Sequence, residues 1–317
     1  MTGLLQAVRR LIVFVASLWV ASVATFTLCA VLPGDPARIL LGLRATPEAV
    51  EQLRSQLGTD RPFLVQYLDW VTGLPFGDFG TSYVSRTDVG GQLAERLGVT
   101  LSLVVLGMLL ALVLAVPLGT LAALGHRRIS GTLLSALSQA GMAVPAFWAG
   151  ILLVFVFAVK LRWFPANGYV QFTTDPLDWL HHLVLPALAL ALVQGAVLSR
   201  YVRSSVLEIM REDFIRTARA VGRTTGGALL RHGLRNAAIP VLTVLGLQLT
   251  TLLVGAIVVE NVFALPGLGR LLLQAVSARD MLVVQGAVML LVCFVLVVNL
   301  VVDLLYTVVD PRLRGAR

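Results

Sequence analysis

Long apolar segments alternate with polar ones along the whole chain, and their lengths predict helices that cross a membrane. A helix needs about 20 residues to span the hydrocarbon core of a bilayer. Six segments come near or exceed that length: Leu11–Leu32, Val99–Leu124, Leu133–Val159, Trp179–Leu198, Ile239–Val259 and Met281–Leu305. The first is long and lacks a clean small-residue cleavage site, which favours a retained span over a signal peptide. We therefore expect an all-α polytopic membrane protein with six transmembrane helices.

The composition agrees with a membrane protein. Of the 317 residues, 57% are hydrophobic and 13% are charged, whereas a soluble domain averages about 45–50% and about 25%. The net charge of +8 is spread over the loops, so it gives no reason to expect a nucleic-acid partner. Cys29 and Cys293 each fall inside an apolar segment, which predicts packing in the core rather than a disulfide.

The distribution of arginine predicts the orientation of the chain. If the N-terminus is cytoplasmic, Arg9, Arg10, Arg127, Arg128 and the arginine-rich loop after the fourth span all face the cytoplasm. Because cytoplasmic loops are enriched in basic residues, we expect both termini inside, N-in and C-in. The expected parts are an N-terminal tail with the first span (1–33), an extracytoplasmic insertion (34–96), a core of five spans with a cytoplasmic loop at 200–236 (97–309), and a cytoplasmic tail (310–317).

The segment between the first two spans predicts a small helical insertion. Thr46-Pro47-Glu48 has the form of a helix start, with a capping hydroxyl, a proline in the first turn and an acid. Val50, Leu53 and Leu57 then share a face, and Gly58 is expected to end the helix. The apolar positions between Phe63 and Val71 predict a second short helix. An ordered loop without a binding role is the alternative interpretation of this segment.

A polar island from Arg200 to Arg235 interrupts the apolar sequence and holds eight arginines. Its apolar residues recur at spacings of three and four, which predicts one shared helical face: Val206, Met210, Phe214, Ala218 and Val221. Arg216, Arg219 and Arg223 share another face, and the acids Glu212 and Asp213 precede Arg216 at pairing distance. Gly222 and Gly226-Gly227 are expected to end the helix before a second one over Ala228–Asn236. The island is interpreted as a docking platform, or alternatively as a basic loop that only sets orientation.

The loop before the last span is apolar for a surface segment. Phe263 and Leu265 offer apolar contacts, and Pro266, Gly267 and Gly269 permit a tight turn. We expect this loop to dip back toward the helices. Leu268 and Leu271–Leu273 predict a short half-buried helix that ends before Arg279-Asp280.

Several classes of function lack their residues. The only lysine, Lys160, is not part of a Gly-Lys-Ser/Thr sequence, so the chain has no P-loop. No metalloprotease or serine-hydrolase motif occurs, and His181-His182 is interpreted as an interfacial pair rather than a metal site. The spans hold no charged residue deep inside, which counts against a channel or a secondary transporter that works alone. A purely structural membrane scaffold remains a further alternative.

Four stretches together resemble a known family: Pro33–Pro36, Gly77–Ser82, Glu212–Gly222 with Arg231–Pro240, and Glu260–Gly269. The tail Asp310–Arg314 also fits its usual ending. The chain resembles the permease subunits of bacterial ABC importers, in the dipeptide/oligopeptide (and nickel) branch and its first-permease (B-type) subgroup. The resemblance implies a type I ABC importer permease fold in the cell inner membrane, and it implies no cofactor in this chain. ATP and Mg²⁺ would be bound by partner subunits.

The resemblance also implies roles for particular residues. The island is similar to the family's EAA loop, which docks on an ATPase, although Arg216-Thr217-Ala218 replace the Glu-Ala-Ala before Gly222. The implied coupling residues are Val206, Met210, Glu212, Asp213, Phe214, Arg216, Thr217, Ala218, Arg219, Ala220 and Gly222. Those implied near the binding protein or ligand are Phe263, Leu265, Pro266, Gly267 and Gly269.

The implied partners are a second permease subunit in a heterodimer, two ABC ATPase subunits, an extracytoplasmic peptide-binding protein and membrane lipid. The expected cargo is di- or oligopeptides. Nickel, glutathione and opines are alternatives within the same family.

Overall fold

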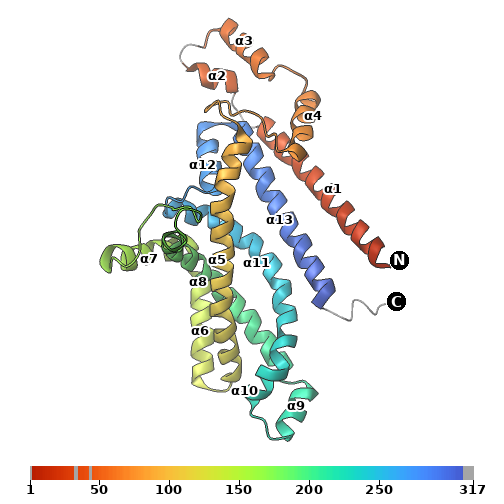
Figure 1. The fold of residues 1–317 in the computed structure, drawn as a ribbon, viewed down its shortest axis with the longest axis vertical. Helices are drawn as coiled ribbons and strands as arrows, with labels where there is room; N and C mark the ends of the chain where they lie inside the picture. The colour runs from red at the N-terminus through yellow and green to blue at the C-terminus, as the bar shows by residue number, and fades with distance from the viewer. Residues whose placement is uncertain (1, 32–34, 43–44, 310–317) are drawn as a thin grey trace. The chain divides into compact units, whose positions relative to one another are not determined.

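A computed structural model describes residues 2–31, 35–42 and 45–309, and these ranges form an all-helical chain (Figure 1). Apart from an isolated bridge between Thr81 and Asp88, the described residues contain no β-structure. The α-helices are α1 (Thr2–Val31), α2 (Pro36–Leu41), α3 (Pro47–Leu57), α4 (Phe63–Gly73), α5 (Val89–Leu124), α6 (Ile129–Ala143), α7 (Ala146–Leu153), α8 (Pro176–Ile209), α9 (Asp213–Ala220), α10 (Thr225–Ala228), α11 (Leu234–Val262), α12 (Leu268–Ala278) and α13 (Met281–Val309). Three short segments complete them: the 3₁₀ turn η2 (Leu74–Phe76) and the π-helical η3 (Val154–Lys160) and η4 (Leu229–Gly233). Pro33-Gly34 and the tail motif Asp310–Arg314 lie outside the described ranges.

Among the described residues, five helices are long and apolar enough to cross a membrane, and a bent pair of helices can make a sixth span. The five are Val8–Val31, Val89–Leu124, Pro176–Ile209, Asn236–Val262 and Met281–Val302. The polytopic helical architecture is confirmed. The weakest apolar segment by sequence becomes one continuous helix of 34 residues, α8, with Pro186 inside it.

The third apolar segment is divided into two helices by a sharp bend. Helix α6 ends at Ala143 and α7 begins at Ala146, and the chain bends by 99° between them. Val144 and Pro145 both adopt extended backbone conformations. A proline disfavours the helical conformation of the residue before it, which explains why the helix ends here. The pair α6–α7 is therefore a broken span or a re-entrant loop.

The chain divides into two compact units, which are described separately below. Unit 1 comprises residues 1–99 and 267–300, and unit 2 comprises residues 100–266 and 301–317. Helices α5 and α13 each begin in unit 1 and continue into unit 2.

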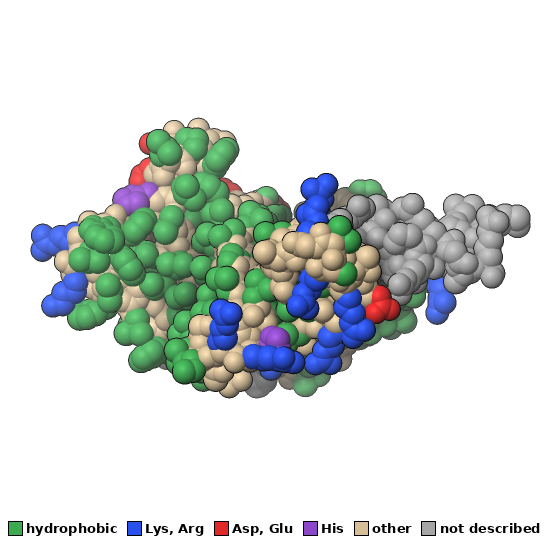
Figure 2. Space-filling model, turned by 90° about the horizontal axis from the view of Figure 1, so that it is seen from below, with side chains coloured by type: hydrophobic (Ala, Val, Ile, Leu, Met, Phe, Trp, Pro, Cys, Tyr) green, Lys and Arg blue, Asp and Glu red, His purple; other side chains and the backbone are tan. Residues whose placement is uncertain are grey.

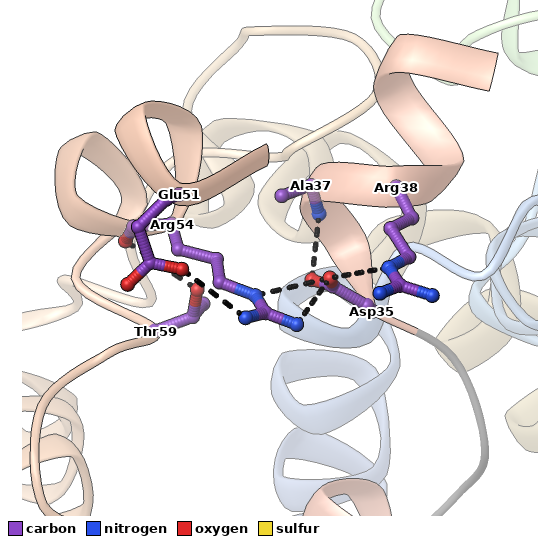
Figure 3. A network of polar contacts seen from close by, with 6 residues as sticks. All are labelled: Asp35, Ala37, Arg38, Glu51, Arg54 and Thr59. Atoms are coloured by element: carbon purple, nitrogen blue, oxygen red, sulfur yellow. Dashed lines mark hydrogen bonds and ion pairs between the residues drawn. The ribbon is translucent and has the colours of Figure 1, made fainter. Parts of the chain in front are cut away.

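Unit 1 contains the predicted helical insertion, and its caps form as expected. Thr46 caps α3 by accepting a hydrogen bond from the Ala49 amide, and Gly58 ends α3 in the left-handed conformation at φ 69°. Figure 3 shows how α2 and α3 are tied together through Asp35. Its carboxylate accepts from the amide of Ala37 (3.1 Å) and from Nε and Nη2 of Arg54 (3.1 and 2.9 Å). These charge-assisted bonds raise the pKa of Arg54 further above its ordinary value.

Aromatic packing joins the insertion to the first span within unit 1. The Phe26 ring of α1 meets the rings of Phe63, Tyr67 and Trp70 of α4 at centroid distances of 5.2–5.7 Å. The hydroxyls of Ser22 and Tyr67 are 2.9 Å apart. Aromatic pairs at such distances stabilise by more than their buried area alone. The second predicted helix is thus confirmed as α4, packed against α1.

Unit 2 is built on close contacts at small residues. A Cβ added to Gly107 of α5 would lie 3.2 Å from the Cβ of Leu190 in α8, and one added to Gly119 would lie 2.7 Å from the Cβ of Val202. Glycine removes the side chain that would hold two helices apart, as in other membrane bundles. Glycines of this unit that have a neighbouring atom within 3.4 Å of an added Cβ include Gly107, Gly141, Gly150, Gly195, Gly246 and Gly255.

Candidate functional site

The polar island of unit 2 contains the end of α8, the short helices α9 and α10, and the start of α11, so the first of the two predicted helices is interrupted. Helix α8 ends at Ile209, and Glu212 is extended at φ −67° and ψ 147° before α9 begins at Asp213. The prediction that Val206, Met210 and Phe214 share one continuous helical face is therefore wrong. The predicted helical spacing of three and four assumes one helix, whereas α8 and α9 are separate helices with a turn between them.

Helix α9 is attached through a single inward side chain. Ile215 is 1% exposed and is the buried residue of α9, whereas Phe214 is 38% exposed and Val221, just after the helix, is 81% exposed. The expected ion pair forms between Arg216 Nη1 and Asp213 Oδ1 at 3.4 Å, on the exposed side. The exposure of Phe214 is compatible with the predicted contact to a partner, whereas sequence periodicity did not identify Ile215 as the buried residue.

The remaining candidate residues of α9 leave most of its surface open. Thr217 donates a hydrogen bond to the Asp213 carbonyl at 3.0 Å, and Ala218 is half-buried. Arg219, Ala220 and Glu212 are exposed. Seen from below, basic side chains stand among hydrophobic ones over this end of the molecule (Figure 2). Helix α9 thus presents exposed apolar and basic side chains together.

The two glycine positions of the island have different roles. Gly222 adopts φ +93° directly after α9, a conformation that favours glycine, and it ends the helix as predicted. The sequence predicted that Gly226-Gly227 would also end the helix, but both residues lie inside α10. Thr224 caps α10 by accepting from the Gly227 amide at 3.2 Å.

The predicted separate helix over Ala228–Asn236 is also wrong. Helix α10 passes through the π-helical η4 directly into α11, and Pro240 lies inside α11. A proline inside a helix removes one backbone donor. Ser205 of α8 donates to the Ala237 carbonyl at 2.9 Å and so joins α8 to α11 one residue after Asn236, whose carbonyl loses its helical partner at Pro240.

A buried apolar cluster holds the base of these helices. It joins α5, α8, η4 and α11, with Met210 packed against its edge, and consists of Ala123, Val202, Val206, Leu229, Ala237 and Val241. Val206 is 0% exposed. Its side chain therefore supports the platform from inside and is not available at the surface of this chain.

The apolar loop after α11 is inserted into unit 2, as the sequence predicted. Phe263 and Leu265 are fully buried, and a Cβ on Gly150 would lie 3.1 Å from Phe263 Cε2. The Leu265 amide bonds back to the Glu260 carbonyl at 2.8 Å, and Pro266 is half-buried. In unit 1, Gly267 and Gly269 are buried and α12 forms as predicted, ending at a left-handed Arg279.

One buried acid was not recognised from the sequence. Glu260 is fully buried, and Thr100 Oγ1 of α5 donates to its Oε1 at 2.6 Å. The residues are 160 positions apart, so no local pattern could pair them. A carboxylate at the end of an apolar segment is a weak signal for burial, because the same pattern marks an ordinary span end.

The adjacent histidines contact backbone carbonyls. His181 Nε2 lies 2.8 Å from the Trp163 carbonyl, and His182 Nδ1 lies 2.9 Å from that of Asp178. Within the described ranges, no cluster of three or more histidine, cysteine or acidic side chains is arranged to hold a metal ion.

Comparison with known proteins identifies the family. The family of binding-protein-dependent transport system inner membrane components matches residues 115–315, and the N-terminal family of the same membrane components matches residues 4–104. The chain belongs to this family of ABC importer permeases. A putative peptide transport system permease protein of Brucella abortus is 43% identical over 314 residues, covering 99% of both chains. The glutathione transport system permease protein GsiC of Escherichia coli is 40% identical, covering 97% of this chain and 98% of its own.

A solved structure shares the fold of this permease. The crystal structure of an amino acid ABC transporter with histidines superposes with a TM-score of 0.50 and 17% identity, covering 68% of this chain and 94% of the other. The protein is accordingly a multi-pass permease of the bacterial inner membrane, and it is a transport subunit rather than an enzyme.

Proposed function

We propose that this permease is one membrane-spanning subunit of an importer for short peptides, driven by ATP that separate subunits hydrolyse. Relatives named for peptide and for glutathione transport support a peptide-like cargo. The observation that favours an external energy source is α9, a short exposed helix mounted on the ends of long spans. The ATP and Mg²⁺ would belong to the ATPase subunits, and this chain would need no cofactor of its own.

Helix α9 would act as the coupling element. An ATPase groove would receive Phe214 and Val221, while Arg216, Arg219 and Arg223 would pair with acids at its rim. Glu212, Asp213, Thr217, Ala218 and Ala220 would complete the contact surface. Met210 and Val206 would transmit the movement from below, because they anchor the end of α8, which leads into α9, in the buried cluster between α8 and α11. Transport requires two conformations whose balance ATP changes, and a mechanical link of this kind can bias it.

The importer would contain further subunits. A second permease subunit would complete the pathway, two ATPases would bind the platforms, and an extracytoplasmic protein would deliver the peptide. Helix α7 bears exposed Phe147, Trp148 and Ile151, a surface suited to lipid or to the second permease. The loop from Phe263 to Gly269 is buried within the chain, so it would influence the ligand site by moving with α11 and α12 rather than by direct surface contact.

Glutathione is the second candidate cargo, because GsiC is similar over nearly the whole chain. Nickel and opines remain alternatives within the family, and a secondary transporter that works alone is the alternative of a different class.

Reconstitution tests the proposal. The chain, its partner subunits and the binding protein are placed in liposomes, and uptake of labelled tri-alanine is measured with ATP inside or outside. We expect uptake only when ATP reaches the ATPase side. Uptake by this chain alone without nucleotide would refute the coupling proposal, and transport of glutathione without tri-alanine would transfer the cargo assignment to glutathione.

A further inference from the structure

A cavity of about 650 Å³ lies within unit 1, apart from the coupling platform. Its walls come from α1, the α3–α4 turn, α4, the segment before α5 and the first turns of α13. Ligand sites for small molecules measure about 300–1,000 Å³. The cavity is therefore large enough for a molecule of a few amino-acid residues.

The charged groups around this cavity carry both signs. Asp69, Asp78 and Arg61 line it, which gives a formal excess of one negative charge. Arg61 Nη1 pairs with Asp69 Oδ2 at 3.0 Å. Asp78 Oδ1 accepts from the Gly80 amide at 2.9 Å, and this bond leaves Oδ2 for another donor. An ammonium group is attracted by Asp78, whereas an additional anion is repelled by the two carboxylates.

The rest of the wall is apolar or weakly polar. Phe26, Phe63 and Leu282 supply apolar surface, and Tyr83 adds a phenol. Burial, together with the nearby Asp280 carboxylate, raises the pKa of Tyr83 above its ordinary value, so its hydroxyl remains a donor at neutral pH. Such a wall accepts small apolar side chains without demanding a particular one.

We propose that this cavity binds a short peptide in its zwitterionic form, with the free ammonium at Asp78 and small side chains against the apolar wall. The inference rests on the proposed function in one respect, namely that peptides are the cargo. It adds a binding site within the permease and a preference among peptides according to their net charge. Neutral or cationic peptides bind better than glutathione, which carries a net negative charge. A phospholipid phosphate is disfavoured for the same reason.

Equilibrium binding tests the site on the assembled importer in phosphatidylcholine nanodiscs, without nucleotide and without the binding protein. The probe is radiolabelled tri-alanine. In Asp78→Asn the side-chain oxygen still accepts from Gly80, so the change removes chiefly the charge. We expect this variant to bind tri-alanine about three- to five-fold more weakly, the range for one exposed charge pair. The control Asp60→Asn makes the same change on an exposed residue outside the cavity and should leave binding unaltered.

A modified ligand makes the test independent of protein folding. N-acetyl tri-alanine lacks the ammonium, so it should bind the original chain as weakly as tri-alanine binds Asp78→Asn, and the substitution should not weaken it further. Absence of saturable binding, or equal binding by Asp78→Asn and the original chain, would overturn the site. If ATP-dependent uptake of tri-alanine persists in that case, the proposed function stands and only this inference fails. If the importer takes up no peptide at all, the proposed function fails as well.

Discussion

At the scale of single residues, the coupling platform depends on Ile215 and Gly222. Ile215 is the buried side chain of α9, so it fixes which face of that helix points outward. Gly222 ends the helix in the left-handed region, where no neighbouring atom lies within 4 Å of an added Cβ. The requirement for glycine is therefore one of backbone conformation and not of space.

Replacing Gly222 with valine tests this requirement. A β-branched residue at φ +93° is strained by about 1–3 kcal/mol, so α9 should end differently and lose its fixed position. We expect the Gly222→Val permease to insert into the membrane and to bind the ATPase subunits. Those subunits should still hydrolyse ATP, but with much less peptide uptake, which is measured as the ratio of transport to hydrolysis. Gly226→Val is the control, because Gly226 is helical and has open space around it. A normal ratio in Gly222→Val would remove the case for this turn.

At the scale of helices, the close crossing of α5 and α8 organises unit 2. Gly107, Gly119 and Gly195 let the two helices approach, and a side chain at Gly119 would meet both the Ser199 carbonyl and Val202. Backbone and a β-branched neighbour cannot move aside as a flexible side chain can. The bent pair α6–α7 packs beside α8, so the position of α8 affects both.

Gly119→Ala should therefore destabilise the protein, by about 1–3 kcal/mol, the usual cost of overpacking. Gly98→Ala is the matched control on the same helix, because an added Cβ there meets no atom within 4 Å. The measurement is thermal unfolding in detergent, followed by tryptophan fluorescence. Equal midpoints for the two variants would show that the crossing tolerates a methyl group.

At the scale of the whole molecule, the chain is two compact units that share α5 and α13. Unit 1 is closed by a buried contact in which the Ser82 hydroxyl donates to Asp280, just before α13. The Ser85 amide donates to Ser82 Oγ at 2.9 Å, so this contact also orders the turn before α5. Because each unit has its own internal contacts, we expect local unfolding of unit 1 to leave unit 2 unaffected.

Ser82→Ala tests that independence. The change leaves a buried carboxylate with one donor fewer, which costs about 1–3 kcal/mol. We expect faster hydrogen exchange at residues 81–88 and in the first turn of α13, with no change in α9. Ser85→Ala is the control, because the Ser85 hydroxyl is exposed and bonds only locally. Faster exchange spreading into α9 would mean that the two units open together.

The sequence by itself determined the helical membrane architecture and most of its local details. Apolar length fixes the spans, and the caps at Thr46, Gly58 and Gly222 follow from backbone rules that involve only neighbouring residues. The family resemblance also rests on short stretches of sequence, and it predicted the transport function.

Only the tertiary structure decided which side chains face inward and which distant groups meet. Periodicity assumes one continuous helix, so it could not account for the turn before α9 or identify Ile215 as the buried residue of α9. The Thr100–Glu260 contact and the cavity beside Trp70 depend on segments distant in sequence. Burial is a relation between a side chain and its neighbours in space, and those neighbours are known only once the helices are packed.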